Sequence, residues 1–272
     1  MRHGIVDAMR MDSPDKRILT VFLVTAFLGA GALGAAQALT PLSPDLLTLN
    51  QFGPAVGVGS VALLWPARVR ALLAGAVSGR GAGAGRGGLL LAAAPLIVVS
   101  AAAVCAALGG EAAAALPYSP FALLVVAQFA GACGEEVGWR CLMQPLLGER
   151  FGTLAAAVMV GLVWGAWHVQ VFAGHPAYAA AFVVMAVALS VVMAVALDGM
   201  GAPRLLFAGG FHALVNLGMA VAMNEEAGEV LPMSALAVAA TFAAFLWIAG
   251  RRKTRTGRGA RTSGAVAAGD AR

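Results

Sequence analysis

The sequence predicts an all-α, polytopic membrane helix bundle with about eight transmembrane helices and both termini in the cytoplasm. Apolar residues make up 60% of the 272-residue chain and charged residues only 11%, and the basic residues lie on one side of the apolar runs. A soluble domain carries about 25% charged residues. A chain of this composition would not cover its surface with polar groups in water, so its main solvent is lipid.

Eight apolar runs are long enough to cross the hydrocarbon core, which takes about 20 helical residues. Gly and Pro residues mark most of the breaks between these runs. The fourth run is unusually long, which allows tilt or a cytoplasmic overhang. In order, the expected spans are 18–38, 51–71, 88–108, 119–147, 153–174, 178–197, 203–223 and 231–250.

The distribution of Lys and Arg sets the expected orientation. With the N-terminus placed in the cytoplasm, 17 of the 18 basic residues fall on the cytoplasmic side, and the outer loops carry acidic residues only. This asymmetry is typical of membrane loops and argues against a nucleic-acid partner. We therefore expect a cytoplasmic N-terminal segment (1–17), a membrane bundle (18–250) and a basic, disordered cytoplasmic tail (251–272).

The first span ends in AAQA, which is similar to a signal-peptidase site. We expect this span to be retained, because its apolar stretch is longer than a usual signal core. Cys105, Cys133 and Cys141 lie in apolar runs without a CxxC pair, which predicts small buried side chains and no disulfide framework.

One basic residue does not fit the one-sided distribution. Arg140 lies inside the fourth span, in FAGACGEEVGWRCLMQPLL, together with Glu135 and Glu136. Charges inside a spanning helix cost at least a few kcal/mol each and usually face a partner or a water-filled cavity. Glu136 and Arg140 are four residues apart on one helical face, so we expect an ion pair. Glu135 is rotated by about 100° from Glu136 and needs another partner.

Two other spans supply candidates for that partner. In the fifth span His168 follows Trp164 by four residues, and in the seventh His212 and Asn216 share one helical face. Counted from the cytoplasmic ends of their spans, Glu135, His168, His212 and Asn216 lie at depths of roughly 18, 22, 14 and 20 Å. The matched depths predict that these groups converge in one cavity, although each alone would also suit interhelical hydrogen bonding.

These three segments together resemble the CPBP family, which comprises the type II CAAX prenyl endopeptidases and their bacterial relatives in bacteriocin processing and immunity, such as lysostaphin-resistance proteins. The family shows EExxxR, FxxxH and HxxxN or HxxxD on three separate membrane helices. The corresponding residues here are Glu135, Glu136 and Arg140, then Trp164 and His168, then His212 and Asn216. Trp164 replaces the usual Phe and preserves an aromatic wall. The resemblance covers residues 119–220, the expected catalytic core, and implies an intramembrane endopeptidase with eight helices.

The residue types suit peptide hydrolysis, which needs an activated water, a stabilised oxyanion and a proton for the leaving amine. Glu135 is the candidate general base, and His168 would orient the water or act later as an acid. His212 and Asn216 would donate hydrogen bonds to the oxyanion.

The remaining motif residues are candidates for supporting or substrate-binding roles. Glu136 and Arg140 would hold the fourth helix in place, or Arg140 would bind a substrate carboxylate. In a zinc-dependent alternative, Glu135, His168 and His212 would form a two-His, one-carboxylate site with an open position for water. We favour the metal-free reading, because the chain has no HExxH motif and an Asn is a poor zinc ligand.

Two other functions remain open at the level of sequence. Intramembrane Glu and His also serve proton-coupled transporters, and a non-catalytic bacteriocin-immunity protein would keep the same fold. The Ala, Gly and Arg content suggests a bacterial gene and a multi-pass protein of the inner membrane. The expected partners are the lipid bilayer and a membrane-associated peptide or protein substrate, which we do not expect to be a true prenylated CAAX protein.

Overall fold

The computed structural model describes residues 13–77, 83–110, 120–201, 203–222 and 229–269, with side chains described up to Arg251. Within those ranges all regular structure is helical. Six segments are long and apolar enough to cross a membrane, and residues 49–64 form a shorter apolar helix. Leu96, Val126 and Phe245, each at least 65% exposed, belong to an outer surface that suits lipid. The prediction of an all-α polytopic bundle is confirmed; the count of eight spans and the cytoplasmic termini stay predictions.

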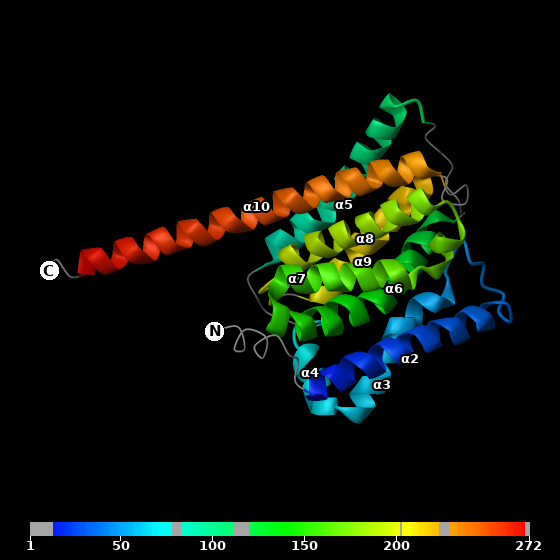
Figure 1. Cartoon of the computed structure of the whole chain (residues 1–272), viewed down its shortest axis with the longest axis horizontal. Helices are drawn as coiled ribbons and strands as arrows, with labels where there is room; N and C mark the ends of the chain where they lie inside the picture. Colours follow the sequence, from blue (N-terminus) through cyan, green and yellow to red (C-terminus); the bar gives the residue numbers. More distant parts are fainter. Residues whose placement is uncertain (1–12, 78–82, 111–119, 202, 223–228, 270–272) are drawn as a thin grey trace.

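The N-terminal helices pack against each other at one side of the bundle (Figure 1). α2 (Ser13–Gln37) contacts α3 (Gly53–Leu64), and the short 3₁₀ turn η1 (Leu49–Phe52) precedes α3. The expected span 51–71 is broken, because a second short helix, α4 (Pro66–Leu72), begins after Trp65. A residue before proline is disfavoured in the helical region, and Trp65 has φ −133° and ψ 59°.

The fourth and fifth expected spans form a nearly continuous helical segment. It consists of α6 (Phe121–Gly138), the π-helical turn η2 (Trp139–Met143) and α7 (Gln144–Trp167). Gly152 interrupts α7 with φ 76° and ψ 166°, a conformation that glycine adopts without a steric cost. The chain therefore changes direction between the regions of the expected spans 119–147 and 153–174. α7 ends earlier than expected, because the backbone leaves the helix at His168, with φ −79° and ψ 63°.

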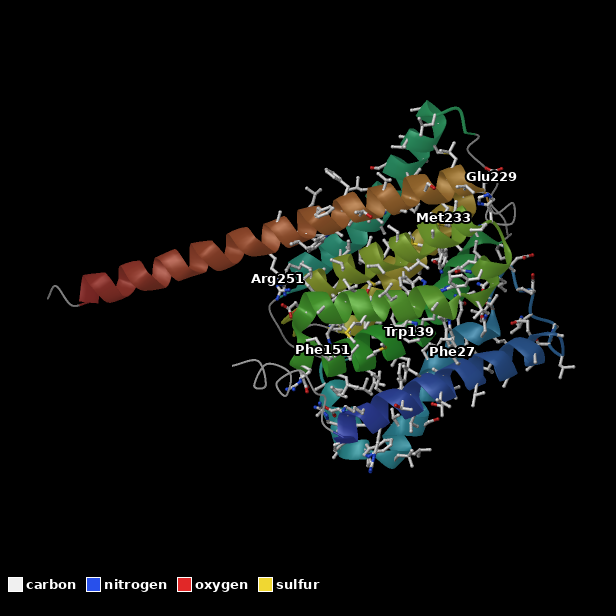
Figure 2. The ribbon with its side chains drawn as sticks, in the orientation of Figure 1. Phe27, Trp139, Phe151, Glu229, Met233 and Arg251 are labelled. Carbon is white, nitrogen blue, oxygen red and sulfur yellow. The ribbon has the colours of Figure 1, made fainter. Side chains whose placement is uncertain are left out.

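Aromatic side chains attach α2 to the rest of the bundle. The Phe22 ring meets the Trp139 ring edge-on at 5.6 Å, and Phe27 meets Trp167 at 4.9 Å. Trp139 and Trp167 are themselves 5.5 Å apart, and Figure 2 labels Phe27 and Trp139 on the two facing elements. These edge-to-face contacts join α2, η2 and the end of α7.

α8 (Pro176–Leu197) is the most buried of the spans. It packs on α7 and on α10 (Val230–Gly269), which lie beside it in Figure 1. The contact with α7 is close at Gly161, where an added Cβ would lie 2.6 Å from the Cα of Val187. One turn before Gly161, the Ala157 carbonyl accepts a 2.6 Å hydrogen bond from Ser190 Oγ. A helix that is apolar on all sides is expected in such an interior position.

Two further helices complete the bundle. α9 (Arg204–Ala222) packs on α6 and on α5 (Ala84–Ala107), and α5 also contacts α10. As a result α6 has α9 on one side and continues through η2 into α7. This arrangement brings the three motif-bearing segments together.

Polar contacts gather at the end of the bundle where α2 begins. Arg68 of α4 pairs with Glu149 of α7 at 2.5 Å and with Asp15 of α2 at 3.0 Å. The hydrogen bonds that Arg68 donates to Glu149 and Asp15 raise the pKa of Arg68 above its ordinary value. Arg251 of α10 forms an ion pair with Asp198 after α8.

The apolar part of α10 runs from Val230 to Arg251, and Figure 2 shows Glu229 and Arg251 at opposite ends of the bundle. The α10 backbone continues as a helix to Gly269 and projects beyond the other helices (Figure 1). The sequence predicted a disordered tail over 251–272, and the assignment of that range as a separate cytoplasmic segment stays a prediction. Residues 1–12 of the expected N-terminal segment lie outside the described residues.

Candidate active site

Glu135 lies in the last turn of α6 and faces α7. Its Oε2 accepts a 2.8 Å hydrogen bond from the indole Nε1 of Trp164. Glu135 is only 1% exposed, and burying a carboxylate without a hydrogen-bond partner costs free energy of folding. The partner that the sequence required for Glu135 is therefore Trp164, the aromatic residue of the second motif.

Trp164 contacts the other charged and imidazole groups of the cluster as well. The guanidinium carbon of Arg140 lies 5.0 Å from the centre of the indole ring, within the range of a cation–π contact. The His212 ring meets the indole edge-on at 5.0 Å, and the His168 ring lies 6.1 Å away. One indole thus touches side chains from η2, α9 and the end of its own helix.

Glu136 connects α6 to α9. Its Oε1 lies 3.0 Å from Nδ1 of His212, and its Oε2 lies 3.2 Å from Nε of Arg140. The carboxylate accepts only, so Nδ1 of His212 carries the hydrogen in this bond. The expected Glu136–Arg140 ion pair is confirmed, whereas the bond to His212 was not foreseen from the sequence.

Arg140 is buried in η2 without a good hydrogen bond. Its three nitrogens make none with the described residues, although Nε is close to Glu136. At 3.2 Å, Arg140 Nε and Glu136 Oε2 are close enough for an ion pair, but the angles do not fit a hydrogen bond. The face of the Trp164 indole is the other group that stabilises the Arg140 charge. π-helical turns are frequent at functional sites, and all five residues of η2 are buried.

His168 is the first residue after α7. Its Nδ1 lies 3.0 Å from the backbone carbonyl of Trp164. A carbonyl accepts only, so Nδ1 carries the hydrogen and a neutral ring has a free lone pair on Nε2. His168 is partly exposed and its ring lies 4.9 Å from that of Phe182.

Asn216 lies one turn beyond His212 on α9, and its hydrogen bond goes to Gln128, a residue outside the three motifs. Its Nδ2 donates to Oε1 of Gln128 at 3.3 Å, and Gln128 Nε2 donates to the Leu46 carbonyl at 3.3 Å. The sequence interpretation missed Gln128. The signal was available, because Gln128 is a polar residue in the apolar run of α6, two turns before Glu135.

The cysteines have no part in these contacts. All three are free, with Cys105 and Cys141 buried and Cys133 partly buried. Among the described residues, no three His, Cys, Asp or Glu side chains group closely enough to hold a metal ion. Glu135 and His212 direct polar atoms toward Trp164 and Glu136 instead.

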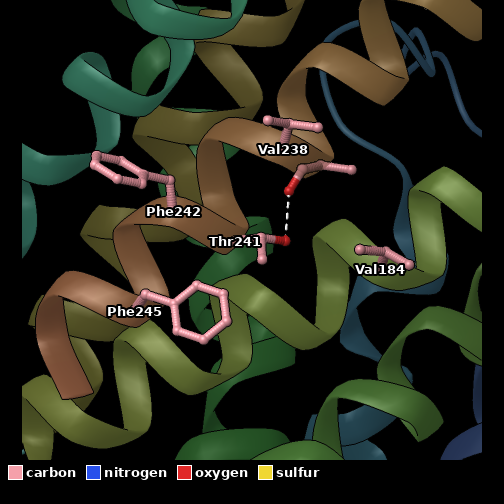
Figure 3. Close-up of a pocket in the computed structure, with 6 residues that line it drawn as sticks. Val184, Val238, Thr241, Phe242 and Phe245 are labelled. Atoms are coloured by element: carbon pink, nitrogen blue, oxygen red, sulfur yellow. Dashed lines mark hydrogen bonds between the residues drawn. The ribbon is translucent and has the colours of Figure 1, made fainter. Parts of the chain in front are cut away.

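Two grooves in the described part of the surface contain none of the motif residues. One of them, between α8 and α10, has a volume of about 320 Å³. Its lining includes Val184, Val238, Phe242 and Phe245 (Figure 3). The Thr241 hydroxyl at this groove donates to the Ala237 carbonyl of its own helix. The lining is almost wholly apolar, as expected for a lipid-facing surface, and it contains none of the motif residues.

The fold and the polar cluster define a multi-pass membrane protein with a buried polar site shared by α6, α7 and α9. Residues 117–218 match the model of a protein family described as Rce1-like, type II CAAX prenyl endopeptidase. The match spans every motif residue, and it supports the resemblance of this segment to the CPBP family. The comparison with curated proteins gives no match. The match supports, in general terms, a membrane-embedded protease of the CAAX type.

Proposed function

We propose that the chain is an endopeptidase that hydrolyses a peptide bond of a membrane-associated peptide or protein at the cluster around Trp164. The observation that carries this proposal is the set of contacts of that indole. It donates to Glu135, stacks against Arg140 and meets the ring of His212. Charges in such an apolar setting interact more strongly than in water, which is the condition that catalysis by fixed polar groups requires.

Glu135 is the proposed general base. Trp164 holds one carboxylate oxygen, so the other is the one that would take a proton from the attacking water. His168 would hold the same water through Nε2, because its Nδ1–H is committed to the Trp164 carbonyl. A positioned base of this kind contributes about 10²–10⁴-fold to the rate.

His212 and Asn216 are the proposed donors to the oxyanion. When His212 carries both protons, Nδ1–H donates to Glu136 and Nε2–H remains for the substrate, while the Glu136 carboxylate balances the ring charge. Asn216 has a second N–H besides the one given to Gln128. The pair would stabilise the negative charge that develops on the carbonyl oxygen.

Glu136 and Arg140 are proposed as supporting residues. Glu136 fixes the His212 ring and pairs with Arg140, and Arg140 in turn lies against Trp164. Loss of either charge would leave the other buried and uncompensated. This arrangement favours the structural role of Arg140 over a direct clamp on a substrate carboxylate.

The proposed mechanism uses no metal. Metal analysis of the purified protein tests this choice directly: we expect zinc well below one ion per chain and full cleavage after chelation. Stoichiometric zinc together with loss of cleavage on chelation would replace it with the zinc-dependent mechanism.

We propose an unmodified membrane-bound peptide or precursor in the bacterial inner membrane as the substrate class. The experiment compares the membrane peptides of cells that contain the native protein with those of cells that contain Glu135→Ala. Cleavage products present only with the native protein are expected. Glu149→Gln is the control, because Glu149 is an exposed carboxylate outside the cluster, and it should leave the products unchanged.

A peptide profile that is identical in native and Glu135→Ala cells, with equal protein levels, would contradict the proposal. Uptake driven by a pH gradient in proteoliposomes, lost in Glu135→Ala, would support a transporter instead.

A further inference from the structure

Gln128 is the polar residue of α6 that the proposed mechanism does not use. It lies two turns before Glu135 and is partly buried between α6, α9 and the segment that follows α2. Both ends of its side chain are engaged, one by Leu46 and the other by Asn216. A polar side chain that forms hydrogen bonds with two partners inside a membrane bundle links the neighbouring segments and does not face solvent.

The direction of the Gln128 amide follows from its partners. The Leu46 main-chain oxygen only accepts, so it requires the NH₂ end of Gln128, at 3.3 Å. The carbonyl end of Gln128 must then point to Asn216. A carbonyl oxygen only accepts as well, so Asn216 must present its own NH₂ group, also at 3.3 Å.

The same logic sets the orientation of the Asn216 amide. In the reverse orientation two carbonyl oxygens would face each other, with both left unsatisfied. Asn216 therefore keeps its NH₂ group on the Gln128 side, with one of the two hydrogens committed and one free. His212, one turn away on the same face of α9, is fixed independently by Glu136.

We infer that Gln128 is a positioning residue: anchored on the Leu46 carbonyl, it selects the amide orientation of Asn216 in which an N–H is available to the oxyanion. This inference rests on the proposed function of Asn216. Two side chains of α6 then orient the two proposed oxyanion donors: Glu136 orients His212, and Gln128 orients Asn216. Without Gln128, the Asn216 amide would rotate freely between an orientation that donates and one that repels negative charge.

The test uses the full-length chain in lipid vesicles and a quenched fluorescent peptide made from a Glu135-dependent cleavage site. Gln128→Leu is expected to lower kcat by about tenfold or more, a part of the ~10²–10³-fold cost of losing an oxyanion donor. KM should change less than about twofold, because ground-state binding is untouched. In an Asn216→Ala background, Gln128→Leu should have no further effect on kcat.

Gln144→Leu is the matched control. Gln144 is also partly buried and also donates Nε2 to a backbone carbonyl, that of Thr153 at 3.1 Å, but this hydrogen bond involves neither Asn216 nor His212. This variant should keep the native kcat. Equal kcat values for Gln128→Leu and the native chain, or a full additional loss in the Asn216→Ala background, would overturn the inference.

A second measurement does not depend on activity. Thermal unfolding of Gln128→Leu, Asn216→Ala and the double variant should show coupled losses, because both single changes break the same bond. Strictly additive losses would overturn the inference. Native cleavage in Glu135→Ala would instead refute the proposed function, while coupled unfolding would still show that Gln128 orients Asn216.

Discussion

At the scale of single residues, the indole of Trp164 is the point on which the cluster depends. Its N–H donates to Glu135, its ring lies nearly perpendicular to the His212 ring, and Arg140 lies over its face. Phe has no N–H that could donate to Glu135, whereas its aromatic ring can still make the ring contacts. The two can therefore be separated by substitution.

Trp164→Phe should keep the ring contacts and lose only the hydrogen bond to Glu135. We expect it to lower the free energy of unfolding by about 1.5–3 kcal/mol, the usual scale for a hydrogen bond to a charged group. Trp164→Ala should lower it by about 3–5 kcal/mol, because it also leaves a cavity. Thermal unfolding in detergent measures both values, and equal losses for Phe and Ala would contradict the separation.

The buried Glu136–Arg140 pair gives a second prediction. Arg140→Met alone should destabilise the protein by about 3–5 kcal/mol, because it leaves the Glu136 carboxylate without its cation. The double variant Arg140→Met with Glu136→Gln should recover part of that loss. Thermal unfolding of both variants checks this, and a double variant that is less stable than Arg140→Met would show that the charges are not coupled.

At the scale of elements, the close approach of α7 and α8 positions Trp164 and His168 opposite α6. Gly161 allows this approach, since an added Cβ would lie 2.6 Å from the Val187 Cα and 2.9 Å from the Ser190 Cβ. Backbone atoms cannot yield as a flexible side chain can, so the two helices would have to separate.

Gly161→Ala should therefore lower the free energy of unfolding by about 1–3 kcal/mol, the typical cost of overpacking. Gly59→Ala in α3 is the matched control, because nothing lies within 4 Å of its added Cβ. The control should be neutral or slightly stabilising, as expected when alanine replaces glycine in a helix. An equal or larger loss for Gly59→Ala in thermal unfolding would contradict the packing explanation.

The sequence predicted the helices better than the contacts between them. The apolar runs and the i, i+4 spacing of Glu136 and Arg140 predicted helices and one ion pair that the structure contains. The Glu136–His212 bond joins residues 76 positions apart, and neither depth nor spacing specifies which side chain of α9 meets which of α6. The π-helical turn at Trp139 was likewise not predicted, because its five residues include no Gly or Pro that would mark a break in the helix.

At the scale of the whole molecule, the basic residues predict which end of the bundle faces the cytoplasm. Arg68 and Arg251 form ion pairs that tie several helices together. Asp45 lies in the loop after α2, on the predicted outer side, and Arg70 lies in α4 on the predicted inner side. Both residues are exposed.

In a chain without its three native cysteines, an Asp45→Cys variant should react with a membrane-impermeant maleimide in intact cells. An Arg70→Cys variant should react only after permeabilisation. This follows from the positive-inside distribution, and mass shifts of the labelled protein measure it. The opposite pattern would reverse the orientation, and labelling of both in intact cells would contradict a single topology.

The central claim is that Glu135 activates a water molecule for peptide hydrolysis. The most direct measurement is cleavage of the quenched peptide in water enriched in oxygen-18, with the products analysed by mass spectrometry. We expect the native protein to place one oxygen-18 atom in the new carboxyl terminus, and Glu135→Gln, which keeps an acceptor for Trp164, to reduce the rate by at least about 10²-fold. Native-rate cleavage by Glu135→Gln would contradict the account.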